Sequence, residues 1–289
     1  VLWERMTFGA DGAGDNRFWW TRPTGELLVP VPDNCIDVPF TVTFVVAAEP
    51  GADKPLTVGG PGVPPVTGTI TGERTRITVA VPAEVELKDV INNVGGIVLV
   101  SGHGADRGFQ EVDHGQYDQP VEVFAACGNG MAIRRSAGGQ AGWFDDDFFM
   151  YYEDTDLSWR LRSAGWSIRY VPTAQLRHIH SASSKEWSPR WVFHVERNRL
   201  LMLTKDATPR LAAGALARFV LTTGSMALRS AREAAHTRRR PAVRAHLLRA
   251  HVLLSYLRLT PRMIVRRRRI AAQATVPRAV LQRELVVKR

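Results

Sequence analysis

A cluster of acidic and aromatic residues between Trp143 and Trp166 is the part of the sequence best suited to chemistry. Carboxylates that stand this close repel one another, so a metal, basic partners or a substrate normally holds them together. The six acids are Asp145, Asp146, Asp147, Glu153, Asp154 and Asp156. This segment is therefore the first candidate for a functional site.

Glu153, Asp154 and Asp156 begin a stretch, residues 153–164, that apolar residues four apart predict to be helical. In a structural interpretation, backbone N–H groups and nearby arginines satisfy these carboxylates at the helix N-terminus. In a functional interpretation, one of them is a general base. Transfer to a hydroxyl group needs a base within hydrogen-bond reach of the acceptor proton, and a carboxylate in a partly dry site serves. The residues alone leave both interpretations open.

Aromatic side chains around these acids favour a carbohydrate ligand. They exclude water from a carboxylate, and they stack on sugar rings, whose C–H faces are apolar. The side chains concerned are Phe148, Phe149, Tyr151, Tyr152, Trp159 and Trp166.

A histidine lies beyond the next expected strand, residues 167–171. By itself such a histidine is more often structural than a ligand. Downstream of an acid cluster, however, His178 becomes a candidate ligand for Mg²⁺ or Mn²⁺. His180 lies two residues further on, and a site with both histidines is the less favoured alternative.

Two further polar motifs have both structural and functional interpretations. Gly128-Asn129-Gly130 follows an expected strand, and its flexible backbone allows a substrate to pass close; a glycine-rich strand end is an equally good interpretation. The quartet Glu196-Arg197-Asn198-Arg199 precedes an apolar run. Such residues usually form the solvated face of a helix, and the alternative is that they pair with the acids of the site or with a diphosphate.

Composition divides the chain into three regions. Residues 1–88 hold alternating β-branched runs between Gly- and Pro-rich turns, which is typical of short antiparallel strands in a β-sandwich-like module. Residues 89–206 hold the candidate site on short strands and helices. Residues 207–289 are mostly helical and rich in Leu, Ala and Arg. We therefore expect an α/β protein with a β-rich N-terminal module and a basic helical C-terminal region.

The charge of the chain is unevenly distributed. The net charge is +10, but residues 1–206 hold 19 Lys+Arg against 26 Asp+Glu, and residues 207–289 hold 19 against 2. A basic region of this kind suits a polyanion. Leucines interleaved with its arginines favour an amphipathic helix on an anionic membrane. We expect no nucleic-acid partner, because no nucleic-acid-binding motif is recognised.

The same sequence indicates a compartment. No signal peptide and no run of about 18 apolar residues is visible, so we do not expect the chain to span a membrane. Two cysteines, Cys35 and Cys127, imply neither a disulfide framework nor a zinc site. The expected location is the cytoplasm, peripheral on the inner face of the plasma membrane.

Several motifs occur together in a fixed order: Gly128–Arg135, Gly142–Asp145, Phe148–Arg162, Gly165-Trp166, Val171-Pro172, His178–Ser181 and Glu196–Asn198. Together they closely resemble family 2 glycosyltransferases, and the nearest branch looks like the rhamnosyltransferases and galactofuranosyltransferase-like enzymes of bacterial envelope synthesis. The resemblance covers roughly residues 89–206. The joint order is highly specific, whereas each motif alone is weak.

The resemblance implies a GT-A fold, a Rossmann-like α/β domain that binds a nucleotide sugar, and an inverting single displacement. It implies that Asp154, beside Glu153, deprotonates the acceptor hydroxyl group, and that His178 helps to hold Mg²⁺ or Mn²⁺. The residues then expected to contact substrate are Gly128, Asn129, Gly130, Tyr152, Asp156, Trp159 and Arg160.

One part of the family pattern is missing. The first nucleotide-binding strands and the Asp-x-Asp motif of the family have no counterpart before Gly128, and Asp145-Asp146-Asp147 lies after it. The chain thus resembles the C-terminal, acceptor-side part of a transferase with a β-rich insertion at residues 1–88. Our hypothesis is that this polypeptide by itself does not transfer sugar.

The expected function is transfer of a rhamnose- or galactofuranose-type sugar from a UDP or dTDP donor to an envelope glycan or lipid-linked acceptor. The alternative is a non-catalytic carbohydrate-binding or scaffold protein derived from a transferase. The Glu153-Asp154 pair and His178 favour the enzyme, and the missing Asp-x-Asp motif favours the alternative.

Overall fold

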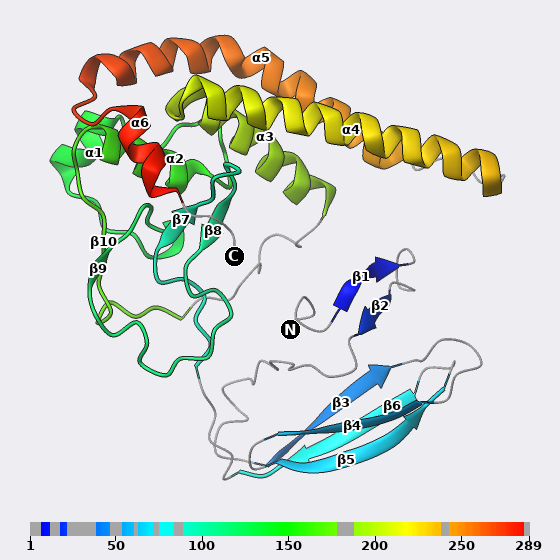
Figure 1. Ribbon diagram of the computed structural model, residues 1–289. Helices are drawn as coiled ribbons and strands as arrows, with labels where there is room; N and C mark the ends of the chain where they lie inside the picture. Colours follow the sequence, from blue (N-terminus) through cyan, green and yellow to red (C-terminus); the bar gives the residue numbers. More distant parts are fainter. Residues whose placement is uncertain are drawn as a thin grey trace. The chain divides into compact units, whose positions relative to one another are not determined.

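The structure is a computed structural model that describes residues 7–11, 18–21, 39–46, 54–60, 63–71, 75–83, 89–177, 188–237 and 243–285. The chain forms two compact units, Val1–Asp89 and Val90–Arg289 (Figure 1). His178 and His180 lie outside the described residues. The basic helices after residue 206 belong to the same unit as residues 90–206.

The first unit consists of antiparallel strand pairs. Its strands are β1 (Thr7–Asp11), β2 (Phe18–Thr21), β3 (Phe40–Val46), β4 (Lys54–Gly60), β5 (Val63–Ile70) and β6 (Thr75–Val81). β1 pairs with β2, β3 with β6 and β4 with β5. Along β6, Ile77, Val79 and Val81 are buried while the residues between them are exposed, because successive side chains of a strand point to opposite faces. The short antiparallel strands expected within residues 1–88 are confirmed for these three pairs.

The second unit combines short strands with long helices. Its elements are β7 (Gly96–Val98), β8 (Gly104–Asp106), β9 (Val121–Glu122), η4 (Gly128–Gly130), α1 (Arg135–Ala141), α2 (Glu153–Ser163), β10 (Arg169–Tyr170), α3 (Pro189–Asp206), α4 (Pro209–Thr237), α5 (Val243–Gln273), α6 (Arg278–Leu281) and η5 (Gln282–Glu284). β7 pairs with β8 and β9 with β10, both antiparallel. A parallel, Rossmann-like sheet is thus not found among the described residues.

Helix α2 forms where its sequence predicts. Leu157 and Leu161, one turn apart, are buried on the same side of the helix. The helix ends at Ser163, and Gly165 follows with φ +88°, a left-handed conformation that glycine adopts without steric cost. The helix start, which carries Glu153 and Asp154, is therefore fixed in register by packing further along.

Helix α3 is the centre of the second unit. Ser188 caps its N-terminus by accepting a hydrogen bond from the Trp191 N–H group, and the run from Leu200 to Leu203 is almost completely buried. Val252, Tyr256 and Met263 of α5 belong to the same hydrophobic cluster. Burying this apolar surface holds α5 against α3.

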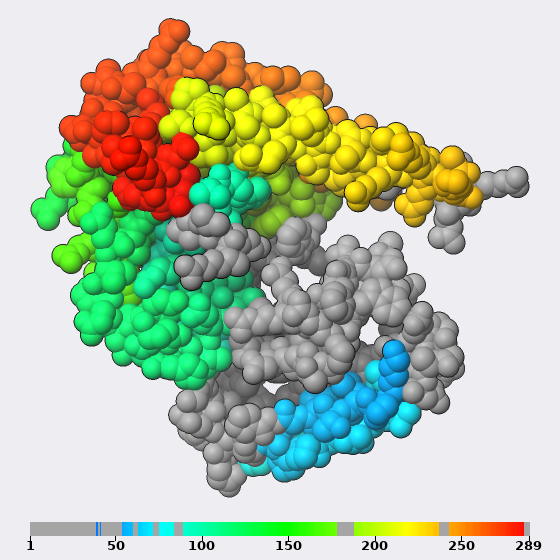
Figure 2. Space-filling view, in the orientation of Figure 1, coloured from blue at the N-terminus to red at the C-terminus, as the bar shows by residue number. Residues whose placement is uncertain are grey.

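Helices α4 and α5 lie side by side along one edge of the unit, drawn in yellow and orange in Figure 2. Arg249 of α5 joins them, since it donates to the hydroxyl group of Thr223 (2.7 Å) and to the carbonyl of Phe219 (3.2 Å) on α4.

Helix α4 is long and apolar enough to cross a membrane by length and composition alone. An 18-residue window within Pro209–His236 has a mean hydropathy of 1.4, and 17% of that window is buried. The expectation that the chain does not span a membrane therefore stays a prediction.

Candidate active site

The loop before α2 has a strained backbone. Four of its non-glycine residues have left-handed backbone angles: Trp143 (φ 51°), Phe149 (63°), Tyr151 (64°) and Tyr152 (68°). An aromatic residue in this conformation costs on the order of 1–3 kcal/mol, and such strain persists only where surrounding contacts impose it. The loop must therefore be held from outside.

Helix α3 supplies that hold. The Asn198 side chain is completely buried, and its Nδ2 donates to the carbonyls of Phe148, Met150 and Tyr151 at 2.8 Å each. Arg197 Nη2 donates to the carbonyl of Asp147 at 2.9 Å. Arg197, Asn198 and Arg199 of the quartet Glu196–Arg199 are buried, so its interpretation as a solvated helix face is wrong for these three residues. These side chains point inward and bind backbone that would otherwise lack partners.

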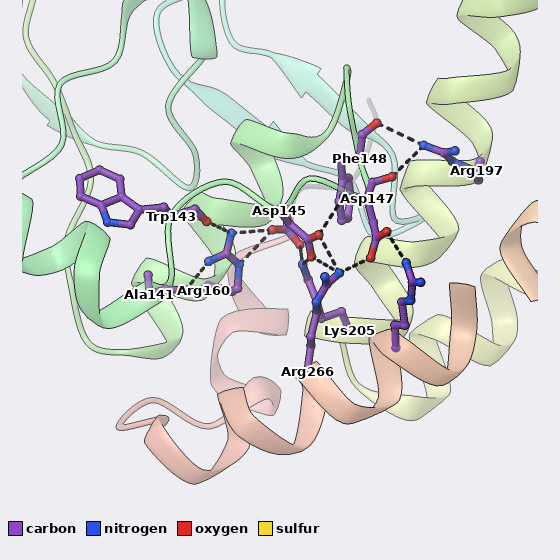
Figure 3. Close-up of polar contacts among 11 residues, drawn as sticks. Ala141, Trp143, Asp145, Asp147, Phe148, Arg160, Arg197, Lys205 and Arg266 are labelled. Atoms are coloured by element: carbon purple, nitrogen blue, oxygen red, sulfur yellow. Dashed lines mark hydrogen bonds and ion pairs between the residues drawn. The ribbon is translucent and has the colours of Figure 1, made fainter. Parts of the chain in front are cut away.

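Arginines of helix α5 bind the carboxylates of the same loop (Figure 3). Arg266 Nη1 lies 2.7 and 2.9 Å from the two carboxylate oxygens of Asp145 and 2.6 Å from Asp147 Oδ2. Arg262 Nη1 reaches Asp147 Oδ1 at 3.1 Å. Phe148, which follows Asp147 in the chain, is fully buried. The acidic run is therefore kept together by basic partners, one of the three explanations that the sequence allowed.

Beneath the loop lies a buried ionic cluster centred on Lys205, which is 1% exposed. Its Nζ lies 2.5 Å from Asp145 Oδ2 and 2.6 Å from Asp156 Oδ1. Asp156 also binds Arg160, with Oδ2 2.8 Å from Nη2. Burial by itself raises the pKa of Asp156, but Lys205 and Arg160 outweigh burial and leave that pKa below its usual value.

A second buried carboxyl group completes the cluster. Neither oxygen of Asp206 has a hydrogen-bond donor among the described residues, and Asp156 Oδ1 has the Lys205 ammonium 2.6 Å away as its ion-pair partner. Burial and the adjacent Asp156 raise the pKa of Asp206 well above its usual value. A proton kept on Asp206 lets it donate a hydrogen bond to Asp156, because two facing carboxylates cannot otherwise bond.

Three residues expected to contact substrate are instead enclosed by the protein. Asp156 and Arg160 belong to the ionic cluster, and Arg160 also donates to the carbonyls of Ala141 and Trp143. Trp159 is 1% exposed and packs edge-on against Phe124 with 5.2 Å between ring centroids. These side chains stabilise the fold around α2, and a ligand at the surface does not reach them.

Tyr152 also has a structural contact. Its hydroxyl oxygen accepts a hydrogen bond from the Gly104 N–H group at 3.0 Å, which ties β8 to the first turn of α2. Burial chiefly raises the pKa of Tyr152 to about 12, so the hydroxyl group stays neutral.

Asp154 lies on the open side of the helix start, beside the glycine motif. Its Oδ2 accepts from the Gly128 N–H group at 2.9 Å, and Oδ1 accepts from the Thr155 N–H group (2.6 Å) and hydroxyl group (3.1 Å). The residues from Gly128 to Gly130 are exposed. The structure thus brings Gly128 and Asp154, 26 positions apart in the sequence, to one accessible place.

Glu153 has a different environment from its neighbour. Its Oε2 is buried and has no hydrogen-bond donor in the described part of the chain. Burial first, and then the negative charge of Asp154, raises the pKa of Glu153 from 4.5 to about 7. The pair therefore places a carboxyl group that is half-protonated near neutral pH beside one that is surrounded by donors.

We expect Glu153→Gln to change the pH dependence of stability. The folded pKa is raised, so folding takes up a proton, and the wild-type free energy of unfolding declines relative to the variant as pH rises from 4.5 to about 7. At about 1.4 kcal/mol for each pKa unit the rise corresponds to about 3.5 kcal/mol, and because the side chain is partly exposed the gap above pH 7 should reach about 2–3 kcal/mol. Urea unfolding of both proteins at several pH values measures it, and parallel curves would contradict the assignment.

The residues for a metal ion are not assembled in the described part of the chain. No group of three or more His, Cys, Asp or Glu side chains there is arranged to hold a metal ion. Cys127, next to the glycine motif, is no alternative ligand as a thiol, because burial chiefly raises its pKa to about 11. No reaction step is therefore assigned to a metal here.

Comparison with known proteins identifies the class of protein. Residues 90–260, more than half of the chain, match the glycosyl transferase family group 2. The chain belongs to this family, as its motifs predicted. No solved structure matches it.

Shorter segments match curated relatives. The N-acetylglucosaminyl-diphospho-decaprenol L-rhamnosyltransferase of Mycobacterium tuberculosis is 50% identical over 62 residues, 22% of this chain and 20% of that protein. The pre-mycofactocin glycosyltransferase of the same organism is 34% identical over 87 residues, 29% of this chain and 18% of that protein. The chain therefore matches about a fifth of the length of these relatives.

The contacts that hold the site were not predicted. The sequence analysis assigned no role to Lys205, Asp206 or Arg266, although Lys205 and Asp206 lie only two and three residues after the apolar run that ends at Leu203. A charged pair so close to fully buried residues was the available signal that it, too, is enclosed.

Proposed function

We propose that the protein is a glycosyltransferase in which Asp154 is the general base. The observation that carries the proposal is the 2.9 Å hydrogen bond between Asp154 and the exposed Gly128 segment, at the start of a helix whose preceding loop is fixed by buried contacts. A base on a rigid element beside flexible glycine backbone suits a reaction in which two substrates meet.

The proposed reaction is a single displacement with inversion. The acceptor hydroxyl oxygen forms a bond to the anomeric carbon of the donor sugar as the bond from that carbon to the nucleoside diphosphate breaks. The hydroxyl proton passes to a carboxylate oxygen of Asp154. Glu153, partly neutral at pH 7, lowers the charge density next to the departing diphosphate.

The similarity to an L-rhamnosyltransferase supports a rhamnose-type sugar carried by dTDP or UDP, ahead of galactofuranose. The same relative is named for an N-acetylglucosaminyl-diphospho-lipid acceptor, and we propose an acceptor of that class. A nucleotide-binding GT-A arrangement and a requirement for Mg²⁺ or Mn²⁺, with His178 as a ligand, belong to this proposal through the family resemblance.

We further propose that the protein lies on the inner face of the plasma membrane. Several apolar side chains on α5 are exposed in spite of their size: Leu247, Leu254, Leu257, Ile264 and Val265. Arginines lie beside them along the helix, and such a pattern suits an anionic lipid surface. The apolar length of α4 supports the same location.

The test is sugar transfer by the protein expressed from its natural reading frame. We expect release of nucleoside diphosphate only when a dTDP or UDP sugar and an N-acetylglucosaminyl-diphospho-lipid are both present, with Mn²⁺ or Mg²⁺ increasing the rate. Calorimetric titration with dTDP and UDP measures donor binding separately. If neither nucleotide binds, the donor class is wrong. Nucleotide binding without transfer to any saccharide would favour the non-catalytic alternative.

A further inference from the structure

A cavity opens between helix α5 and the strained loop before α2. This pocket, of about 420 Å³, lies between the loop and α5, and none of its lining residues is Glu153, Asp154 or part of the Gly128–Gly130 motif. The residues that matter here are Asp146, Asp147, Phe149, Arg197, Arg258 and Arg262. We call it the loop–α5 pocket.

The Phe149 ring lies at this pocket and also contacts α3, with 5.6 Å to the His194 ring centroid and 5.7 Å to the Arg190 guanidinium carbon. Its side chain is 68% exposed, whereas its neighbour Phe148 is fully buried and fills the core. Phe149 is held at φ +63° by hydrogen bonds from Arg197 and Asn198 to the carbonyls on either side of it. The strained backbone thus keeps an aromatic side chain largely exposed at the pocket, where a ligand can reach it.

Two arginines of α5 face the pocket one helical turn apart. Arg258 is exposed and makes no hydrogen bond or ion pair within the part of the chain that the structure describes. Arg262 is 68% exposed and makes one 3.1 Å contact with Asp147, whose other oxygen Arg266 binds at 2.6 Å. Arg262 can therefore change partner while Asp147 stays neutralised, because an exposed ion pair contributes little.

Guanidinium groups one turn apart match the spacing of oxygens in a phosphate or diphosphate group. The lining holds three arginines against two aspartates, and of these Asp146 is exposed and has no cation partner among the described residues. The negative charge of Asp146 opposes anion binding, so its removal should strengthen binding where removal of an arginine weakens it.

The pocket also has apolar lining beside its arginines. Leu259 and Phe149 both line it, and Phe149 is 68% exposed. A ligand that satisfies both parts carries a phosphate group on a hydrocarbon chain. We infer that the loop–α5 pocket binds the phosphate groups of a lipid-linked acceptor, with Arg258 and Arg262 as the anion ligands and Phe149 beside them. This inference rests on the proposed function and adds to it the place where the acceptor is held.

The test measures binding and needs no turnover. Geranyl diphosphate is titrated into the full chain by calorimetry, with inorganic pyrophosphate and phosphatidylglycerol vesicles as separate probes. We expect Arg258→Gln and Arg262→Gln each to weaken geranyl diphosphate binding about tenfold, the change expected for loss of one charge-assisted contact. Arg268→Gln, an equally exposed arginine of α5 outside the pocket, should leave it unchanged. Asp146→Asn should strengthen it.

Other outcomes overturn the inference. Equal losses in Arg258→Gln and Arg268→Gln, confined to vesicle binding, would show that these arginines serve a membrane surface generally. If geranyl diphosphate does not bind, or if pyrophosphate binds with the same affinity, the pocket does not recognise a phosphate group on a hydrocarbon chain. Binding of the donor nucleotides dTDP and UDP is measured independently. The inference about the pocket can therefore be rejected while the proposed function stands, and the proposed function can be rejected while the pocket still binds geranyl diphosphate.

Discussion

Asp154→Asn is expected to abolish sugar transfer and leave donor binding nearly unchanged. Asparagine keeps a carbonyl oxygen that accepts the Gly128 N–H hydrogen bond, so the position of the glycine motif is retained. It removes the carboxylate that takes the acceptor proton, and a positioned base contributes about 10²–10⁴-fold to such a step. The measurement is kcat with saturating donor and acceptor, together with the dissociation constant of the nucleotide by calorimetry.

The pattern of constants separates a base from a structural residue. Loss of an interaction made only in the transition state lowers kcat and kcat/KM together, whereas loss of ground-state binding raises KM. Asp118→Asn, an exposed carboxylate outside the site, is the matched control and should retain wild-type constants. Near-normal turnover of Asp154→Asn would exclude this residue as the base.

The parts of the site that the sequence predicted are those encoded locally. The start of α2 and its apolar residues one turn apart are properties of a short segment, and both lie where they were expected. The approach of Gly128 to Asp154 followed only from the family resemblance, since no local rule joins two segments that far apart.

The parts that the sequence did not predict depend on distant partners. Asn198 and Arg197 bind carbonyls about 50 positions earlier in the chain, and Arg266 binds carboxylates about 120 positions earlier. A polar residue on a helix has the same local pattern whether it faces water or buried backbone. Only the packing of α3 between the loop and α5 decides which environment applies. Asp156 and Arg160 were therefore predicted to contact substrate, whereas their partners are residues of the protein itself.

The buried lysine predicts the largest effect on stability. Lys205→Met removes the cation that lies between Asp145 and Asp156 and leaves two carboxylates in a dry interior. Loss of one partner from a buried ion pair costs about 3–5 kcal/mol, because the remaining charge is uncompensated. Urea unfolding at pH 7 measures the free energy, and a change below about 1 kcal/mol would contradict the ionic cluster.

Asp206→Asn distinguishes the effect of charge from the effect of disturbed packing. Lys205 and Asp206 are adjacent and both are 1% exposed, so a packing effect alone would destabilise both variants. Asp206 has a raised pKa, so the wild-type chain takes up a proton on folding and loses stability as pH rises above the usual carboxyl range. Asparagine replaces the protonated acid with a neutral donor and removes that dependence. Asp206→Asn should therefore be close to wild type in stability at acid pH and more stable than wild type at neutral pH, opposite in sign to Lys205→Met.

The ionic cluster supports the loop that leads to Asp154, so turnover should follow the same order as stability. We expect turnover to be retained in Asp206→Asn and lost in Lys205→Met, even at temperatures where Lys205→Met is folded.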